Sequence, residues 1–277
     1  WFAINIKLYP RVLMNFKRII FALLYSKGEF FLSRNFTLQK VGNLNWLKNN
    51  YRFGETCEYV DEIIILLITP NPTLSDKKNF LKDVNKFREK IFVPITLGGG
   101  VTNLNDVKMY FDNGADKILI NKIVHTDLRS VEKISKHYGS QALSVMVDYK
   151  KLNNKYYTFI NSGKTRSLEL KEYLYKVKNL NFGEIIFNSI DNDGTGFGFD
   201  DPIIKKIPYF LKNPILLMGG AGKPQHFYEI LRNRKISGAI TANLFNFLGK
   251  GLELSRNYSI NKGLKIIKFY DLNEKNI

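Results

Sequence analysis

The sequence predicts an α/β protein, a (β/α)8 TIM barrel built from two duplicated half-barrels. Short apolar runs alternate with segments of helical periodicity, which is typical of parallel strands joined by helical crossovers. Phrases also recur at a nearly constant distance: Glu62-Ile-Ile-Ile and Glu184-Ile-Ile-Phe lie 122 residues apart, and Pro94 and Pro214 lie 120 apart. The chain has 277 residues, which suits one barrel of roughly 250 residues.

Eight strands are expected, spaced so that a helix or a hairpin fits between them. They cover 17–24, 62–68, 95–98, 117–120, 142–148, 184–188, 215–218 and 238–241. Amphipathic spacing predicts helices over 104–113, 128–138, 168–180 and 224–232. The longer connections 25–41 and 149–166 occupy equivalent places in the two halves, and each is expected to contain a small hairpin. Loops that follow barrel strands form the catalytic face, so these two should flank the active site.

We expect the barrel to cover residues 17–250. Residues 1–16 are expected to be an N-terminal extension outside it, and residues 251–277 a charged C-terminal tail. Met14 stands just before the first convincing strand, so we expect translation to start there.

The composition limits the classes of partner. The chain carries 42 Lys and Arg against 25 Asp and Glu, a formal net charge of +17. The basic residues are scattered rather than clustered, so we expect no nucleic acid; AT-rich coding or an acidic small substrate or partner explains the charge. The longest apolar run, 63–68, is far shorter than the roughly 18 to 20 residues of a membrane span. We therefore expect a cytoplasmic protein without membrane insertion.

No metal or cofactor is expected. Cys57 is the single cysteine, which excludes an intrachain disulfide and a thiolate cluster. His125, His137 and His226 are dispersed over helical segments without ligand spacing.

Two glycine turns, each at the end of an apolar run, predict two phosphate sites. Such turns present backbone N–H groups to an anion at the start of a helix. The glycines concerned are Gly98, Gly99, Gly100, Gly219 and Gly220. A structural duplicate without a ligand is the alternative. Asn121 and Asn243 end the neighbouring strands, where they either donate to phosphate or serve as ordinary turn residues.

Asp148 ends the fifth strand after a buried apolar run. A carboxylate at the catalytic mouth is a natural general acid or base, and a loop or helix cap is the alternative. Its counterpart after the first strand is Leu23-Leu24, which carries no ionisable group.

The segment that follows the sixth strand is rich in polar residues. Asp191-Asn-Asp193-Gly194 resembles a calcium loop, but Pro202 stands where the bidentate Glu would be needed. We expect Asp193, as a second catalytic residue, and Gly194, together with Asn188 at the strand end, to contact hydroxyl, amine or phosphate groups of a substrate. A plain loop is the alternative.

Six phrases spread over residues 17–247 match one known family. They are Lys17-Arg-Ile-Ile, Val93-Pro-Ile-Thr-Leu-Gly-Gly-Gly, Gly114-Ala-Asp-Lys-Ile-Leu-Ile-Asn, Tyr138-Gly-Ser-Gln-Ala, Gly183-Glu-Ile-Ile-Phe-Asn-Ser-Ile-Asp-Asn-Asp-Gly-Thr, and Gly219-Gly-Ala-Gly followed by His226-Phe. In these phrases the chain resembles the HisF family, the cyclase subunit of imidazole glycerol phosphate synthase. The resemblance implies a heterodimer with a HisH-like glutaminase subunit. It also implies a small substrate with two phosphates, and ammonia that travels through the barrel.

The resemblance also implies an ammonia gate at the bottom of the barrel. The family forms this gate from one Arg, two Glu and one Lys, which correspond here to Arg18, Glu62, Glu184 and Lys117. A structural ion network is the alternative, because charges at this end can serve stability alone.

Several positions depart from the family pattern. Ring closure in the family uses two aspartates; Asp148 matches one, and Leu24 stands in the place of the other. Further departures are Leu32, Leu67, Lys122 and Asn243, at positions where the family contacts substrate or phosphate. Loss of a proton-transfer group costs on the order of 10²- to 10⁴-fold in rate, so efficient cyclisation is not expected.

Leu23-Leu24 resembles instead a HisF-like branch that converts acetamido groups of nucleotide sugars to acetamidino groups for surface polysaccharides. Three hypotheses follow: sugar amidation, the cyclase step of histidine biosynthesis, and a catalytically silent binding paralogue.

Overall fold

The structure is a computed structural model that describes residues 16–50, 58–89, 91–242 and 250–267. Several sequence expectations therefore lie outside the described residues: the proposed start at Met14, nearly all of the N-terminal extension, Cys57, Asn243 and the last ten residues.

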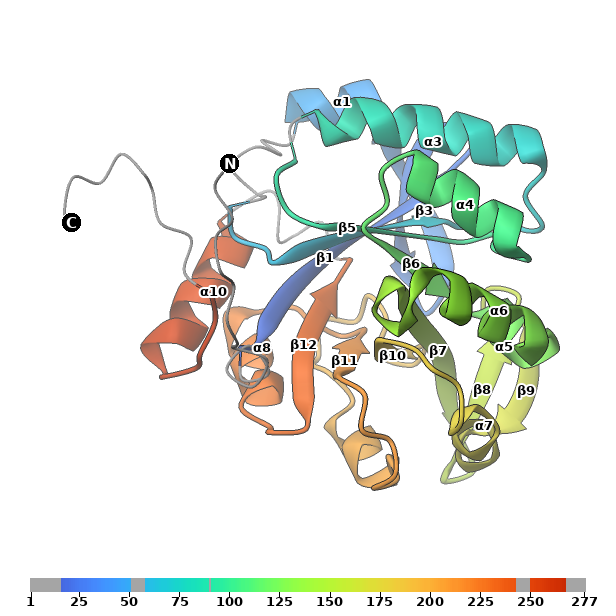
Figure 1. The fold of residues 1–277 in the computed structure, drawn as a ribbon. Coiled ribbons are helices and arrows are strands. Elements are labelled where there is room, and N and C mark those ends of the chain that lie inside the picture. Colours follow the sequence, from blue (N-terminus) through green and yellow to red (C-terminus); the bar gives the residue numbers. More distant parts are fainter. Residues whose placement is uncertain (1–15, 51–57, 90, 243–249, 268–277) are drawn as a thin grey trace, which may run out of the picture.

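Eight parallel strands close into a barrel (Figure 1), as the sequence predicts. The ladder runs β1-β4-β5-β6-β7-β10-β11-β12 and returns to β1, and the pairing of β7 with β10 completes the circle. The strands are β1 Arg18–Ser26, β4 Glu62–Leu67, β5 Ile95–Gly98, β6 Lys117–Ile120, β7 Leu143–Leu152, β10 Glu184–Ser189, β11 Ile215–Met218 and β12 Ile236–Thr241. Each coincides with an expected strand to within a few residues, and β1 and β7 run further than expected because they continue into hairpins.

Helices surround the strands, and the four that the sequence predicts are all present. They are α4 Leu104–Asp112, α6 Leu128–Tyr138, α7 Leu170–Val177 and α8 Pro224–Leu231. The remaining helices of the described residues are α1 Leu44–Asn50, α3 Leu74–Arg88, α5 Lys122–Thr126, α10 Gly251–Asn261, and the 3-10 helices η2 Ser140–Ala142 and η3 Asp201–Lys206. The connection between β10 and β11 is therefore covered by a single 3-10 turn.

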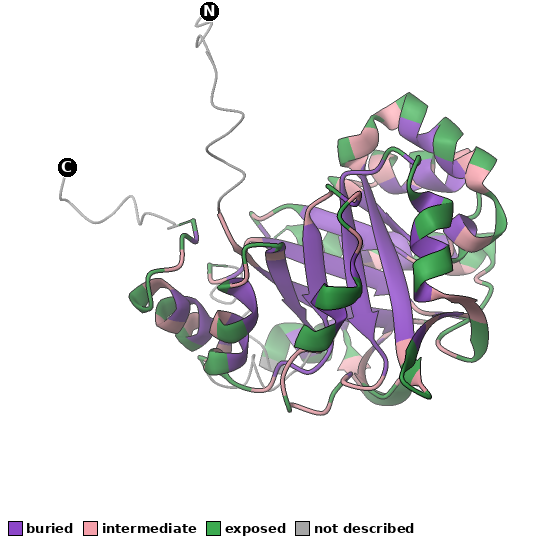
Figure 2. Ribbon diagram, turned by 90° about the horizontal axis from the view of Figure 1, so that it is seen from below, coloured by how far each residue is buried: buried purple, intermediate pink, exposed green. Residues whose placement is uncertain are grey.

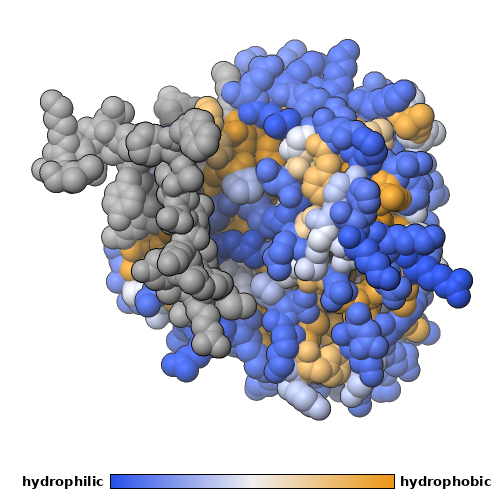
Figure 3. All heavy atoms as spheres, viewed as in Figure 1, coloured by the Kyte–Doolittle hydropathy of each residue, from blue (hydrophilic) through white to orange (hydrophobic). Residues whose placement is uncertain are grey.

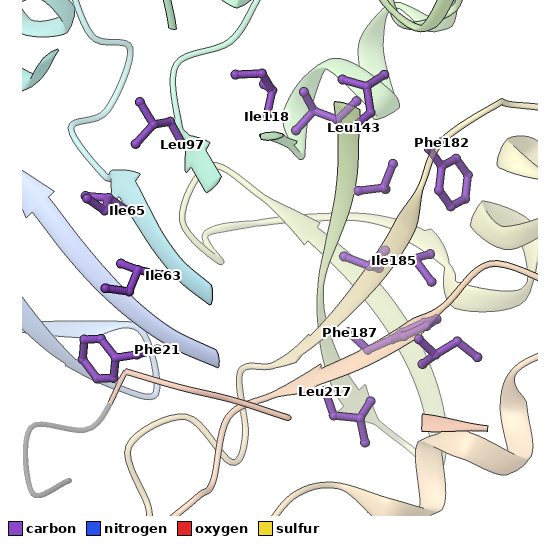
Figure 4. Packing of buried hydrophobic residues seen from close by; sticks show 14 of the residues in the cluster. Phe21, Ile63, Ile65, Leu97, Ile118, Leu143, Phe182, Ile185, Phe187 and Leu217 are labelled. Atoms are coloured by element: carbon purple, nitrogen blue, oxygen red, sulfur yellow. The ribbon is translucent and has the colours of Figure 1, made fainter. Parts of the chain in front are cut away.

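Alternation along the strands produces two separate apolar layers. Ile20, Ala22 and Leu24 of β1 belong to a cluster inside the barrel, whereas Ile19 and Phe21 belong to the larger cluster between strands and helices. Figure 4 shows the outer packing, with side chains from several neighbouring strands. In Figure 2 the strands of the barrel are mostly buried, while the helices expose their outer sides. Successive strand side chains point to opposite faces, so this pattern fixes which residues reach the barrel axis.

Helix α3 illustrates how local sequence sets an element. Thr73 caps its N-terminus and forms a reciprocal capping box with Asp76. The helix then buries Phe80, Val84 and Phe87, which follow one another at helical spacing and pack in the outer cluster.

The two expected hairpins are both present. Strand β1 continues into β2 Glu29–Arg34 and β3 Thr37–Asn43, and β7 continues into β8 Lys155–Ile160 and β9 Thr165–Glu169. Phe36 at the tip of the first hairpin is in close contact with Gly163 of the second, where an added Cβ would lie 2.7 Å from the Phe36 ring. The hairpins therefore meet over one end of the barrel.

The halves repeat in hydrogen bonding as well as in sequence. Ile63 N donates to Pro94 O over 3.0 Å, and Ile185 N donates to Pro214 O over 2.9 Å. At the other end Ile68 N bonds Tyr25 O and Ile190 N bonds Tyr149 O, over 2.8 and 2.9 Å. The second pair makes Leu24 and Asp148, one residue earlier, equivalent positions.

Helix α10 forms in the segment expected to be a charged tail, and it lies beside α8 (Figure 1). Its Arg256 is buried and makes a two-pronged ion pair with Asp61 at 2.9 and 3.0 Å. Asp61 also accepts from the backbone N–H of Ile19 at the start of β1. The ion pair thereby ties this helix to the bottom of the barrel.

The side of the surface seen in Figure 3 is mostly hydrophilic, with apolar patches between the polar residues. Among the described residues, no helix combines the length and the apolar character that crossing a membrane requires.

Candidate functional site

Asp148 lies in β7 where the strand leaves the barrel and enters the second hairpin, inside the mouth of the barrel, and is 7% exposed. Its two carboxylate oxygens accept from two amides: Asn121 donates to Oδ2 over 2.7 Å, and Asn188 donates to Oδ1 over 2.8 Å. The amides come from the ends of β6 and β10, the two strands on either side. The mouth therefore holds one carboxylate in a fixed position.

Burial raises the pKa of Asp148 to about 6, and the nearby negative charge of Asp193 acts in the same direction. The hydrogen bonds from Asn188 and Asn121 oppose this rise. A carboxyl group with a pKa near 6 can exist in both protonation states close to neutral pH, which is the property that proton transfer requires.

The amide oxygens of Asn121 and Asn188 have no hydrogen-bond partner among the described residues, although both atoms are buried. A buried acceptor without a partner is unfavourable, and both lie beside Asp148. Hydrogen-bond donors of a bound ligand would satisfy them. The contacts that the sequence predicts for these asparagines, phosphate for Asn121 and a polar group of a substrate for Asn188, stay predictions; in the structure both side chains donate to Asp148.

The two glycine turns lie at equivalent strand ends. An added Cβ at Gly99 would stand 2.0 Å from the carbonyl oxygen of Leu67, and at Gly219 it would stand 2.8 Å from that of Ser189. Both glycines have positive φ, 93° and 97°. Only glycine fits such a close backbone approach, so the duplication preserves a shape that a side chain would destroy.

Asp193 lies at the edge of the mouth and joins the two halves. Its Oδ2 accepts from Ser33 Oγ over 2.5 Å and from Phe36 N over 3.0 Å, both in the first hairpin. Burial raises its pKa, while these hydrogen bonds oppose the rise. Asp193 therefore anchors the hairpin, a contact between distant segments that the sequence analysis did not predict.

A cavity of about 470 Å³ lies beneath the first hairpin. Its walls are the hairpin, the loop after β10, the second glycine turn and the end of β12. The residues are Leu32, Ser33, Arg34, Asn35, Thr37, Leu38, Gln39, Asp193, Gly194, Met218, Gly219, Gly220, Ala221, Ile240, Thr241 and Ala242. The volume is within the usual range for small-molecule sites.

The opposite end of the barrel holds a closed ring of four charges. Arg18 bonds Glu62 over 3.1 Å and Glu184 over 2.6 Å. Lys117 bonds the same two carboxylates over 2.6 and 2.8 Å. All four residues begin strands of the barrel, so the structure brings together the four residues that the sequence analysis grouped.

Two hydroxyl groups complete the ring. Thr96 donates to Glu62 over 2.5 Å, and Ser144 donates to Glu184 over 2.6 Å. Sequence analysis missed both residues, although each stands near the start of a predicted strand. Strand alternation directs both side chains into the barrel, as it does the four charged ones, and this pattern is the sequence signal that could have identified them.

The ion pairs of the ring shift the pKa values of Glu184 and Arg18. Burial alone would raise the pKa of Glu184, but the charges of Arg18 and Lys117 and their hydrogen bonds hold it at about 2. Burial opposes the charge of Arg18, and the two glutamates nevertheless raise its pKa. The formal charges of the two cations and the two buried carboxylates cancel, and the four side chains together close this end of the barrel.

In the ranges that the structure describes, no three His, Cys, Asp or Glu side chains are grouped so that they could hold an ion.

These features define a duplicated (β/α)8 barrel with two buried carboxylates, Asp148 and Asp193, at its C-terminal mouth and an ion-pair ring at its N-terminal end. The family model for "Histidine biosynthesis protein" matches residues 56–273. The chain belongs to this family.

Two relatives show the range of similarity. A protein of Parasynechococcus marenigrum, provisionally named imidazole glycerol phosphate synthase subunit hisF2, is 41% identical over 251 residues, which is 88% of this chain and 90% of the relative. The imidazole glycerol phosphate synthase subunit HisF of Chlorobium phaeobacteroides strain BS1 is 32% identical over 252 residues, which is 90% and 98% of the two chains. The resemblance to HisF noted from six phrases is thus confirmed.

Proposed function

We propose that this protein is the ammonia-using subunit of a glutaminase-coupled synthase that acts on a nucleotide-linked acetamido sugar. In this reaction the acetamido oxygen carries an activating group donated by a nucleoside triphosphate. Ammonia attacks the acetamido carbon, the oxygen leaves with its activating group, and an acetamidino group results. The product serves surface-polysaccharide biosynthesis.

The observation that carries the proposal is the unequal pair Leu24 and Asp148. The two positions are equivalent in the duplication, yet Leu24 packs in the apolar cluster inside the barrel with Leu66 and Met218. Ring closure of the histidine precursor calls for two proton-transfer groups at these positions, as the resemblance implies. Attack by ammonia needs one base, which takes a proton from the nitrogen as the carbon–nitrogen bond forms. Asp148 can act as this base without a second ionisable group at the position of Leu24.

The ring formed by Arg18, Glu62, Lys117 and Glu184 is the proposed ammonia gate. Its support is position: it closes the barrel opposite Asp148, and the interior between them is lined by apolar residues such as Ile20, Ile64 and Ile186. An apolar passage suits neutral ammonia and disfavours ammonium.

The proposed partner is a HisH-like glutaminase that docks around the ring. Phe92 and Tyr209 stand in the loops before β5 and β11, at the ring's end of the barrel, and are 95% and 87% exposed. Exposed aromatic residues are favoured in protein–protein contacts.

The glycine turns Gly98–Gly100 and Gly219–Gly220 are proposed to bind phosphate groups, with Gly194 as a further backbone contact. Asn121 and Asn188 are proposed to contact the substrate through their unpartnered oxygens, and Asp193 is proposed to assist Asp148. Asn243 belongs to the same proposal and lies outside the described residues.

The cyclase reaction of imidazole glycerol phosphate synthase is the second candidate, and the names of the two relatives favour it. Two experiments separate the candidates. In a histidine-requiring strain that lacks its cyclase, expression of this protein should not restore growth without histidine; growth would favour the cyclase. With a cognate glutaminase and a nucleoside triphosphate as the activating reagent, a nucleotide-linked acetamido sugar should yield an amidine in a glutamine-dependent reaction. Failure with both substrate classes would favour a binding protein without catalysis.

A further inference from the structure

Each glycine turn is held by a side chain from the first turn of the helix that follows it. In the first half Thr102 N donates to Asp106 Oδ2 over 2.9 Å, and in the second half Gly222 N donates to His226 Nδ1 over 3.1 Å. Asp106 and His226 are the third residues of α4 and α8, and corresponding residues of the two pairs lie 120 apart in the sequence. The two halves therefore share one contact but use two different acceptors.

The acceptor of the first half is a buried carboxylate with a permanent cation beside it. Asp106 accepts from Lys77 Nζ over 2.6 Å and from Thr102 Oγ1 over 2.7 Å. Burial would raise the pKa of Asp106, but the hydrogen bonds from Lys77 and Thr102 outweigh it and lower the pKa below its ordinary value. Asp106 therefore stays an acceptor throughout the pH range in which a histidine titrates.

The acceptor of the second half can lose that ability. Because Nδ1 of His226 accepts from a backbone N–H, it carries no proton, and the ring is neutral with its proton on Nε2. A protonated ring has a donor at both nitrogens, so the N–H of Gly222 would then point at another N–H. The contact at His226 therefore exists only in the neutral form of the ring.

The charges that act on His226 belong to its own helix segment. Burial lowers the pKa of His226, which is 8% exposed; the charge of Lys223 acts in the same direction, and Glu229 opposes it. A cation in the first turn of a helix is also unfavourable, because the helix dipole is positive there.

The other elements around His226 direct their charged groups to different partners. The loop after β10 presents glycine backbone to the ring, while its carboxylates Asp193 and Asp200 accept from Ser33 and Tyr149. On α10, which packs beside α8, Arg256 is paired with Asp61.

His226 contacts both the second glycine turn and the loop that covers it. Gly222 is packed against Gly196 of that loop, since an added Cβ would lie 2.4 Å from the Gly196 carbonyl oxygen. Gly198 N donates to Gly220 O over 2.7 Å, and an added Cβ at Gly198 would lie 3.7 Å from Cδ2 of the His226 ring. The bond from Gly222 to His226 therefore fixes the end of a turn on which the loop after β10 rests.

We propose that His226 is a positioning residue that holds the second glycine turn only while its ring is neutral, whereas Asp106 holds the first turn regardless of histidine titration. On acidification the second turn loosens and the first does not. The consequence for substrate rests on the proposed function: KM for the nucleotide-linked sugar should rise as pH falls, whereas protonation of Asp148 lowers kcat.

Backbone amide exchange in the full chain tests the inference without substrate. The exchange rate of the Gly222 N–H is divided by that of the Thr102 N–H, because both amides share the intrinsic pH dependence of exchange. From about pH 8 to about pH 5, across the histidine range, this ratio should rise about fivefold to tenfold. Long-range NMR correlations of the imidazole should place the proton of the neutral His226 ring on Nε2.

Two variants separate titration from packing. His226→Asn keeps an oxygen acceptor that does not titrate, so the exchange ratio should stay constant over the same pH range. His137→Asn is the matched control, because His137 is an exposed histidine on α6, and its ratio should rise as in wild type.

A ratio that stays constant in wild type would overturn the inference, and so would a neutral His226 ring with its proton on Nδ1. An equal rise in His226→Asn and wild type would also overturn it. Should the Asn variant unfold, the tautomer and the ratio of the wild-type protein decide. A ratio that rises as expected, in a protein that amidates no sugar, would refute the proposed function and leave this inference standing.

Discussion

The side-chain amide of Asn188 donates to the carboxylate of Asp148 over 2.8 Å, from the neighbouring strand of the barrel. This bond favours the charged form of Asp148, whereas burial favours the neutral form. The balance between the two decides at which pH the carboxyl group can accept a proton.

The first prediction concerns that balance. A pKa of about 6 for Asp148 means that the base is ionised above this pH, so the rate should rise with pH through about 6 and then level off. Asp148→Asn should abolish the rise and lower the rate by about 10²- to 10⁴-fold. Carboxyl NMR of Asp-labelled protein measures the same pKa without a substrate, and a value near 4 would contradict the prediction.

The same shift predicts a pH dependence of stability. The pKa of Asp148 is raised from 3.8 to about 6 on folding, so the folded state holds the proton more tightly. The stabilising effect is complete below 3.8 and is lost as pH rises to about 6. Relative to wild type, Asp148→Asn should therefore gain about 3 kcal/mol in free energy of unfolding between pH 3.5 and pH 7. Urea titrations at both pH values measure this difference, and a difference that does not change with pH would refute it.

A second variant tests the amide directly. Asn188→Ala removes one hydrogen bond to the ionised carboxylate, so the pKa of Asp148 should move upward by about one unit. Asn181→Ala is the matched control, since Asn181 is exposed and lies before β10 rather than at its end. Equal titration curves for the two variants would mean that the amide does not act on Asp148.

The ion-pair ring predicts a large loss of stability. Lys117→Met leaves Glu62 and Glu184 buried with Arg18 as their one remaining cation, which should lower the free energy of unfolding by about 3–5 kcal/mol. Lys108→Met is the control: its Asp112 pair is exposed on α4, so the urea midpoint should hardly move. Equal midpoints for the two variants would show that the ring does not stabilise the barrel.

The glycine turn predicts a difference between two Gly→Ala changes. Gly99→Ala places a methyl group 2.0 Å from the Leu67 carbonyl oxygen, whereas at Gly139 nothing lies within 4 Å. Both glycines have positive φ, and Gly139 combines φ 86° with ψ 152°, so both changes carry a backbone penalty of about 1–3 kcal/mol. Gly99→Ala should lose at least about 1 kcal/mol more, measured by urea unfolding. Equal losses would mean that the turn relaxes without penalty.

The sequence predicts most of the barrel because alternation and repetition act over short distances. All eight strands, four helices and both hairpins can be placed from local patterns, and the repeat groups Glu62 with Glu184. The 3-10 turn η3 and the helix α10 are harder, because one has no periodic apolar face and the other is held by a distant ion pair between Arg256 and Asp61.

The site is only partly predictable for the same reason. The position of Asp148 follows from its place at a strand end, and the ring follows from the resemblance. That Asn121 and Asn188 turn to Asp148, and that Ser33 reaches Asp193, depends on contacts between residues 27 to 160 positions apart. No local pattern encodes such distances.

The contact between Ser33 and Asp193 also bears on how the two halves depend on each other. The first hairpin belongs to one half by sequence, yet its tip is bonded to the other half. A half-barrel produced alone would contain either the first hairpin or the second glycine turn, but not both. Neither half alone would therefore form the complete cavity. Two separately expressed halves should recover ligand binding only when they reassemble, so the ancestral repeat has become a mutual dependence.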